Sequence, residues 1–321
     1  MLRVSPAQAV NYRLAVNNLA SRLAPGSYVE AAYAGLQDTA PRDALLGMHA
    51  RVAACEPSAW QDPRLIQTYS PRAAVYVLPA ADLGVFTVGR LPRDAEARQV
   101  VEDLAEAACR ALGGQELRGT ALFARAACAT GRIAIRWTTT AVYVRECERP
   151  SIDPETARIE LCRRHVHAFG PTTPATFAWW AGVSVRDART TFDLLARELM
   201  PIDLADREAW VLAADEAAVR SAEPTRGVRL LVASDLRLLG QDRARLFVGP
   251  GRSDHSPLQD WFHPGGLLID GRIAGAWGRR GGQVRVRAAG SLAPSTRSAI
   301  QAEAVSMPIP NAEVTVSLTE H

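Results

Sequence analysis

The sequence predicts an α+β fold: three tandem winged-helix modules, each a helix-turn-helix with a β-hairpin, followed by a small C-terminal β-barrel-like domain. Three observations support this prediction. Residues 155–212 combine helix-capping signals, a tight turn and a hairpin pattern. The same order of elements recurs twice before them, and short strand-like segments with glycine-rich turns follow Pro224. A repeated helical and hairpin plan is typical of an array of similar modules.

The pattern is clearest in the third module. A helix is expected over residues 155–169 and ends at Gly170-Pro171. Thr173-Pro174 places a capping hydroxyl before a proline at the first position of a second helix, which runs to Trp180. Gly182 makes the turn, and Ser184 caps the third helix. Residues 201–203 and 209–212 are expected to be the two strands of the wing.

The third helix of this module has two unlike faces. An apolar stripe at spacings of three and four consists of Val185, Ala188, Phe192, Leu195 and Leu199. The opposite face carries Arg186, Thr190 and Arg197, where a recognition helix meets a DNA groove or its phosphates. Double-stranded DNA is therefore the first partner to expect. The alternative is a helical subdomain that only packs.

The two modules before it are predicted from weaker signals. The first has helices at 5–20, 28–34 and 42–54 and strands at 74–78 and 84–89. The second has helices at 95–112 and 115–130 and a hairpin of 132–137 with 142–145, in which Ile133, Ile135 and Trp137 alternate as in a half-buried strand.

The C-terminal part reads as a compact β-domain. Strands are expected at 229–232, 244–248, 266–270, 272–277, 283–288 and 311–318, with a helix at 295–304. Asp270-Gly271 is a strong two-residue hairpin signal. The predicted domains are residues 1–92, 93–150, 151–222 and 223–321.

Composition limits the partners. The chain has 321 residues, 48% of them hydrophobic, and a net charge of +3, too small for a diffuse attraction to nucleic acid. It has no lysine, so all 37 basic residues are arginine. Arginine suits bidentate phosphate contacts, although a GC-rich coding bias is the more economical explanation of this usage.

The sequence gives little indication of a metal site, a disulfide framework or a membrane span. The cysteines Cys55, Cys109, Cys128, Cys147 and Cys162 are odd in number and far apart, which argues against a zinc module or a disulfide framework. Cys162, His165 and His167 could suggest a metal, but the two histidines diverge on a helix and no carboxylate cluster accompanies them. We therefore expect no cofactor and no metal. No membrane span is expected either, because prolines break the uncharged stretch 165–185. A soluble, cytoplasmic monomer is the expectation.

Several strings resemble the winged-helix DNA glycosylases of the AlkZ/YcaQ superfamily, and most resemble its AlkX-like branch. They are Gly35-Leu36-Gln37, His49-Ala50-Arg51-Val52, Ala168-Phe169-Gly170-Pro171 through Trp180-Ala181-Gly182, Arg229-Leu230-Leu231 with Asp235 and Leu239-Gly240, and His263-Pro264-Gly265-Gly266 through Asp270-Gly271-Arg272 to Trp277. The resemblance extends from about residue 10 to 305, in order. It implies three winged helices and a barrel around a DNA channel, and removal of N-alkylated purines, including N7-guanine adducts and interstrand crosslinks.

The resemblance also implies a catalytic site in the first module. Relatives carry Gln-x-Gln or Gln-x-Asp, whereas this chain has Gln37-Asp38-Thr39, with the carboxylate one place early. Where relatives carry Arg-Gly-Thr-Leu-His, only Arg72 is kept. Cleavage of a glycosidic bond develops positive charge on the sugar, so a glutamine that orients water and a nearby carboxylate suit the reaction. Alternatively, Asp38 or Thr39 caps the helix that follows.

DNA contacts are assigned to one set of side chains: Arg42, His49, Arg51, Arg72, Arg186, Arg279 and Arg280. The absence of lysine argues against a Schiff-base lyase, so a monofunctional hydrolase is expected. The departure at Thr39 keeps open a second class of function, a non-catalytic winged-helix protein that regulates transcription or binds damage. No dimerisation helix is evident, which argues against a regulator of palindromic operators.

Overall fold

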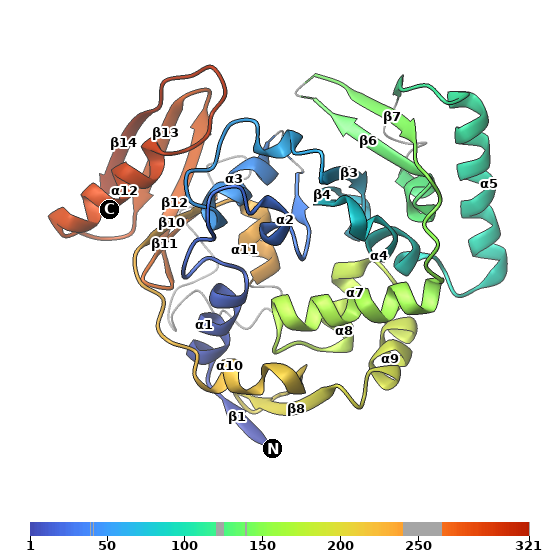
Figure 1. The fold of residues 1–321 in the computed structure, drawn as a ribbon. Coiled ribbons are helices and arrows are strands. Elements are labelled where there is room, and N and C mark those ends of the chain that lie inside the picture. Colours follow the sequence, from blue (N-terminus) through green and yellow to red (C-terminus); the bar gives the residue numbers. More distant parts are fainter. Residues whose placement is uncertain (39, 41, 120–124, 139, 240–264, 321) are drawn as a thin grey trace.

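Three β-sheets organise the protein in its computed structural model (Figure 1), which describes residues 1–38, 40, 42–119, 125–138, 140–239 and 265–320. Within these residues the sheets have six, three and five strands. Helices lie between and beside them, so the mixed α+β class is confirmed.

The six-stranded sheet joins two segments of the chain that the sequence presents as separate modules. Its strands, in spatial order, are β2 (Leu36–Gln37), β4 (Val75–Pro79), β3 (Leu65–Tyr69), β6 (Ile133–Trp137), β7 (Val142–Glu146) and β5 (Leu117–Gly119). The hairpins β3–β4 and β6–β7 meet through antiparallel pairing of Gln67 with Ile135. One hairpin from each of the first two predicted modules therefore belongs to a single continuous sheet.

One predicted strand in this region was wrong, and one strand was not predicted. Residues 84–89 are not a strand but lie in α4 (Leu83–Thr87) and the short 3₁₀ helix Val88–Arg90, while the true partner of β4 is β3. All of residues 83–89 are buried, and a short apolar run without alternation fits a buried helix as well as a strand. Strand β3 was not predicted because Gln67 and Thr68 are polar, although both side chains are buried.

The predicted helix 115–130 is found only in part: residues 125–127 are helical and continue into the 3₁₀ helix Cys128–Thr130, whereas β5 (Leu117–Gly119) occupies its first part and 120–124 lie outside the described residues. Before it, α5 (Ala95–Leu112) has the predicted bounds and ends at Gly113 in the left-handed conformation. Earlier still, α1 (Pro6–Val16) begins with a capping box at Ser5, followed by α2 (Tyr28–Ala31) and α3 (Asp43–Arg51).

Residues 154–212 follow the predicted order closely. Asp153, Thr173 and Ser184 each cap a helix through their side-chain oxygen: α7 (Pro154–Phe169), α8 (Pro174–Ala181) and α9 (Val185–Leu194). The third helix stops before Leu199, which opens the hairpin β8 (Leu199–Leu204) and β9 (Glu208–Leu212). Strand β1 (Leu2–Val4) adds to β8 in parallel. Val185, expected in the apolar stripe, is 45% exposed.

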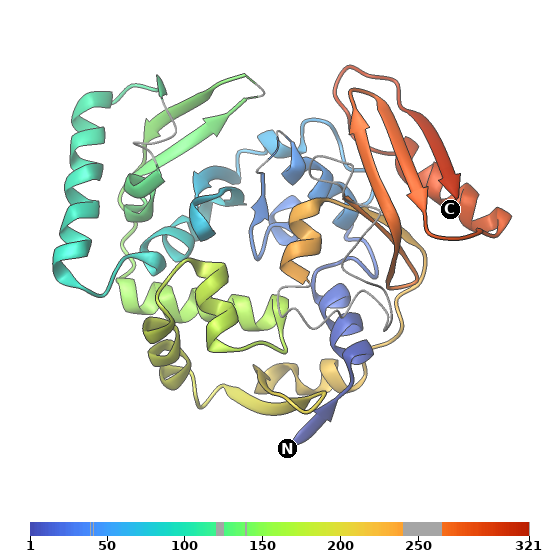
Figure 2. The same cartoon turned by 180° about the vertical axis from the view of Figure 1, so that it is seen from behind.

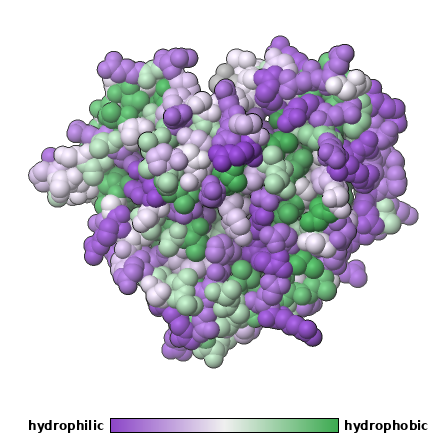
Figure 3. All heavy atoms as spheres, viewed as in Figure 1, coloured by the Kyte–Doolittle hydropathy of each residue, from purple (hydrophilic) through white to green (hydrophobic). Residues whose placement is uncertain are grey.

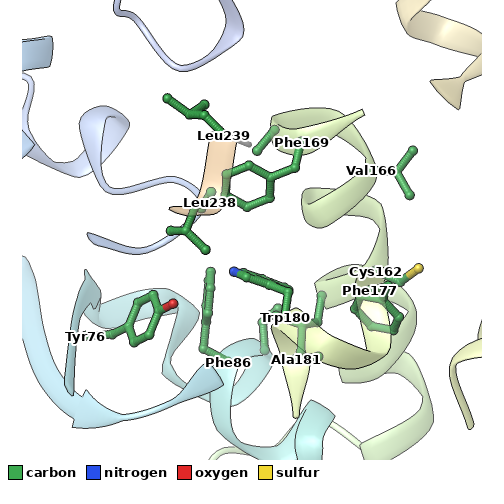
Figure 4. Close-up of a cluster of buried hydrophobic side chains, with 14 of the residues drawn as sticks. Tyr76, Phe86, Cys162, Val166, Phe169, Phe177, Trp180, Ala181, Leu238 and Leu239 are labelled. Atoms are coloured by element: carbon green, nitrogen blue, oxygen red, sulfur yellow. The ribbon is translucent and has the colours of Figure 1, made fainter. Parts of the chain in front are cut away.

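One hydrophobic cluster connects distant segments. Phe86 from α4, Trp180 from α8 and Leu238 from α11 (Ala233–Leu239) are buried together with Tyr76 (Figure 4). The ring centroids of Phe86 and Trp180 lie 6.3 Å apart, edge to face. This shared core holds the end of α8 against the β3–β4 hairpin.

The C-terminal strands form an open sheet among the described residues, not a closed barrel. The order is β10 (Val228–Leu231), β11 (Gly265–Ile269), β12 (Arg272–Arg280), β13 (Gln283–Ala288) and β14 (Thr315–Glu320), with β13 and β14 parallel. Helix α12 (Pro294–Val305) packs on β10 and β14, and α10 (Glu216–Arg220) precedes the sheet. The predicted strand 244–248 lies outside the described residues.

The arrangement leaves two outer lobes around a central body. The sheet β10–β14 and the pair formed by α5 and the β6–β7 hairpin project on opposite sides of α3, β3 and β4 (Figures 1 and 2). The face seen in Figure 3 is mostly hydrophilic, with apolar side chains in separate patches.

Candidate active site

Gln37 is the last residue of β2 and lies opposite Tyr76 of β4 in the sheet register. Its side chain is 7% exposed. The amide oxygen Oε1 accepts a hydrogen bond of 2.6 Å from Nη2 of Arg72 and a longer one of 3.5 Å from the Tyr76 hydroxyl. Two donors to the same oxygen fix the orientation of the carboxamide, because its oxygen can accept a hydrogen bond and its NH₂ group cannot.

Arg72 reaches Gln37 from the turn between β3 and β4. The turn places Arg72 at φ 55° and Ala73 at φ 53°, a left-handed conformation uncommon for residues with a side chain. Such backbone strain recurs at functional sites. The second guanidinium nitrogen, Nη1, is buried without a hydrogen-bond partner among the described residues. The guanidinium carbon also lies 4.5 Å from the ring centroid of Trp179.

Asp38, one residue on, is 1% exposed and both its oxygens are engaged. Oδ1 accepts from the backbone amide of Ala44 at 3.0 Å, and Oδ2 accepts from Nε2 of Gln67 at 3.1 Å. Burial raises the pKa of Asp38 to about 6, against the opposing effect of the Ala44 amide and the charge of Arg42. Asp38 thus caps the first turn of α3, as the alternative interpretation of this residue expects.

A second carboxyl, Asp43, stands at the start of α3 and is half-buried. Burial and the charge of Asp38 raise the pKa of Asp43 to about 7, while Arg279 acts in the opposite direction. Arg42 lies between them in sequence, at φ 74°, with its guanidinium 3.5 Å from the ring centroid of Trp60 and Nη1 donating to the Trp137 carbonyl. Two carboxyls and a glutamine therefore share one short segment, and Thr39 lies outside the described residues.

The predicted DNA contacts fall into two groups. Arg279 and Arg280, at the end of β12, and Arg186, on α9, have exposed side chains. The charge of Arg279 lowers the pKa of Asp43, so Arg279 on the C-terminal sheet lies near the start of α3. Arg42 and Arg72 are half-buried beside Gln37 and Asp38, where they already hold protein groups.

His49 and Arg51 do not belong to this surface, and their assignment to DNA is corrected. Arg51 is 4% exposed and donates twice to Asp235, at 2.8 Å each, as well as to the Gly47 carbonyl. His49 is 3% exposed, with Nε2 2.9 Å from the Ser306 hydroxyl, and burial lowers its pKa to about 4. Both side chains pack α3 against the C-terminal domain.

Two residues of this region were missed by the sequence analysis, Asp43 and Gln67, and the contact of Trp179 with Arg72 was not predicted. Gln67 was hidden because its strand was not recognised, and the Oε1 of Gln67 also accepts from the Trp137 amide at 2.7 Å. The only sequence signal for Trp179 is the pair Trp179-Trp180, since adjacent residues on a helix point about 100° apart. One ring is buried and the other is 41% exposed.

Chemically, the site offers an oriented amide, two carboxyls whose pKa values lie near neutrality, and nearby arginines. In the described part of the chain no three His, Cys, Asp or Glu side chains are grouped to hold a metal ion. Nor does any helix there have the length and apolar character to cross a membrane. The arrangement suits charge stabilisation and water positioning.

Comparison with known proteins identifies the family. A family model described as DNA glycosylase AlkZ-like matches residues 124–307. The "Interstrand DNA cross-link repair glycosylase" of Streptomyces sahachiroi is 30% identical over 130 residues, which are 39% of this chain and 35% of that protein. The match therefore spans about a third of the curated relative. The solved structure of Streptomyces sahachiroi DNA glycosylase AlkZ superposes with a TM-score of 0.80 at 17% identity, covering 99% of this chain and 100% of that one.

Proposed function

The chain belongs to the AlkZ-like DNA glycosylase family, and we propose that it hydrolyses the N-glycosidic bond of N-alkylated purines in duplex DNA. The observation that carries this proposal is the carboxamide of Gln37, whose orientation is fixed by Arg72 and Tyr76, in a chain segment that also holds the carboxyls of Asp38 and Asp43. The family relation favours the enzyme over a non-catalytic DNA-binding protein.

The residues suit a reaction in which the leaving group needs little help. A purine alkylated at N7 is already cationic, so it departs without a strong general acid, and the sugar becomes oxocarbenium-like. The protein has to supply a water and a negative or dipolar group near the developing charge. Gln37 is proposed to orient the water. Because Asp38 is buried and both its oxygens are engaged, its proposed role is to hold Gln67 and α3. The half-buried Asp43 is proposed to stabilise the cation.

The proposed substrates are N7-guanine adducts and the interstrand crosslinks made from them. A crosslinked base cannot be extruded freely, so an enzyme for it has to work without a tight base pocket. The relative named as a crosslink repair glycosylase supports this substrate class. The absence of lysine from the sequence excludes a lysine Schiff base, so the proposed reaction is monofunctional hydrolysis that leaves an abasic site.

We also propose that three winged-helix modules, residues 1–92, 93–150 and 151–222, and a C-terminal domain from 223 surround the duplex. The support is the helix and hairpin order of 154–212 and the two further hairpins in the shared sheet. Exposed Arg186, Arg279 and Arg280 are the proposed phosphate contacts, with the chain acting as a monomer.

The test is excision from defined duplexes. The protein is incubated with DNA that carries either one N7-methylguanine or one nitrogen-mustard crosslink, and the abasic product is cleaved by alkali. Release of the modified base with strand breaks only after alkali is expected. Tight binding without base release from either duplex would support the non-catalytic alternative and contradict the proposal.

A further inference from the structure

We propose that Trp179 is a positioning residue for the reaction: its exposed ring holds Arg72 in the geometry that fixes Gln37. This inference rests on the proposed function, because it assigns a role to Trp179 in the same site. Trp179 itself need not touch the reacting atoms.

The exposure of Trp179 contrasts with the burial of its neighbour Trp180. Both lie on α8, and Trp180 is completely buried in the cluster with Phe86 and Tyr76 (Figure 4). Trp179 is 41% exposed and is the one exposed tryptophan among the residues that the structure describes. The ring of Trp179 therefore does not belong to the core, and it contacts Arg72 instead.

The end of α8 is fixed in place from both sides. Gly182 follows it at φ 71°, and a side-chain carbon there would come within 3.2 Å of the Arg72 backbone nitrogen. Arg90 donates from Nε to the Ala181 carbonyl at 2.7 Å, which satisfies one of the free carbonyls at the helix end. The helix therefore meets the β3–β4 turn at close range, and Trp179 is carried there on a rigid element.

From that position the ring contacts the guanidinium of Arg72. The 4.5 Å separation between the guanidinium carbon and the ring centroid is a cation–π contact. The same guanidinium donates to Gln37 Oε1 at 2.6 Å. Arginine has many rotamers, so a planar surface under its head restricts it to the one that reaches Gln37. Trp179, Arg72 and Gln37 thus form a chain from α8 to β2.

The test compares Trp179→Ala with Trp179→Phe, and uses Leu194→Ala as a control. Leu194 is 55% exposed on α9, so its loss removes a similar exposed apolar side chain without touching Arg72. Single-turnover excision, affinity for undamaged duplex and melting temperature are measured for each. We expect Trp179→Ala to slow excision roughly tenfold with unchanged affinity and stability, and Trp179→Phe to stay within about twofold of wild type. Arg72→Lys should lose as much as Trp179→Ala, because an ammonium lacks the planar fork.

A double substitution separates positioning from direct contact with DNA. If Trp179 acts through Arg72 and Gln37, adding Trp179→Ala to Gln37→Ala causes little further loss. Additive losses, a change confined to DNA affinity, or wild-type excision by Trp179→Ala each overturn the inference.

A readout without catalysis keeps the two proposals apart. In ¹⁵N-labelled protein the Gln37 side-chain amide, assigned by its loss in Gln37→Ala, should shift in Trp179→Ala and not in Leu194→Ala. If wild type excises nothing, the proposed function fails while this shift still decides the positioning role. An unmoved amide in Trp179→Ala overturns the positioning role whatever the activity.

Discussion

The two ends of helix α3 carry the same kinds of residue and do opposite things. At its start, Asp38 and Asp43 are carboxyls whose pKa values are raised by burial, and Arg42 lies between them in the sequence. At its end, Arg51 is closed in a buried ion pair with Asp235. Both ends contributed residues to the predicted DNA site, but only the start lies beside Gln37. The difference shows that a charged side chain that is closed in a buried ion pair, such as Arg51, is not available to a surface site.

The largest expected effect comes from removing the buried ion pair at the end of α3. Arg51→Ala leaves Asp235 buried without its partner, so unfolding free energy should fall by about 3–5 kcal/mol. Urea denaturation of this variant beside exposed Arg186→Ala, expected within about 0.5 kcal/mol of wild type, measures it. If Arg51→Ala is as stable as wild type but binds duplex more weakly, Arg51 belongs to the DNA surface after all.

The two ends should also respond to pH with opposite sign. The folded pKa of Asp38 is raised from 3.8 to about 6, so the folded state binds the extra proton. Its contribution is fully present below pH 3.8 and is lost as pH rises through about 6, in total about 3 kcal/mol at 1.36 kcal/mol per pKa unit. The folded pKa of His49 is lowered from 6.5 to about 4, so its contribution is present above 6.5 and is lost as pH falls toward 4.

Unfolding free energies of wild type, Asp38→Asn and His49→Gln between pH 5 and 8 separate the two effects. The advantage of wild type over Asp38→Asn should shrink as pH rises through this range. The advantage over His49→Gln should shrink as pH falls. Parallel curves for all three proteins contradict the contrast between the two ends.

A smaller effect is expected from a substitution beside the start of α3, where the rate of base excision is measured instead of the free energy of unfolding. Gln37→Ala should lower single-turnover excision at least roughly tenfold, about 1.4 kcal/mol of barrier, with duplex affinity nearly unchanged. Stability should fall by about 1 kcal/mol, because Arg72 loses its hydrogen-bond acceptor. Full excision by Gln37→Ala would mean that the water is held by another residue.

The smallest effect concerns the exposed arginines. Each phosphate contact releases counterions, so log affinity falls with log salt by about 0.9 per contact. Arg186→Ala, Arg279→Ala and Arg280→Ala should each flatten that slope by roughly one unit, on damaged and undamaged duplex alike. Titration of labelled duplex between low and moderate salt checks this. Three unchanged slopes place the DNA on another face.

Local chemistry explains why much of the fold could be predicted. Thr173-Pro174, Gly182 and Ser184 carry their capping and turn signals in a few adjacent residues, and α8 and α9 begin where these signals indicate. Alternation from Ile133 to Trp137 likewise identified β6. The strand β3 escaped because Gln67 and Thr68 are buried by strands distant in sequence, which no local pattern records.

The sequence by itself determined the α+β class, most helix boundaries in residues 154–212 and the family, and through the family it pointed to Gln37. Only the tertiary structure decided which charged residue contacts that glutamine and which are paired elsewhere. Asp235 neutralises Arg51 from 184 residues away, and Trp179 reaches Arg72 from a different helix. Whether a polar side chain is free or satisfied depends on such distant partners and on its removal from water, and neither is a property of a short segment.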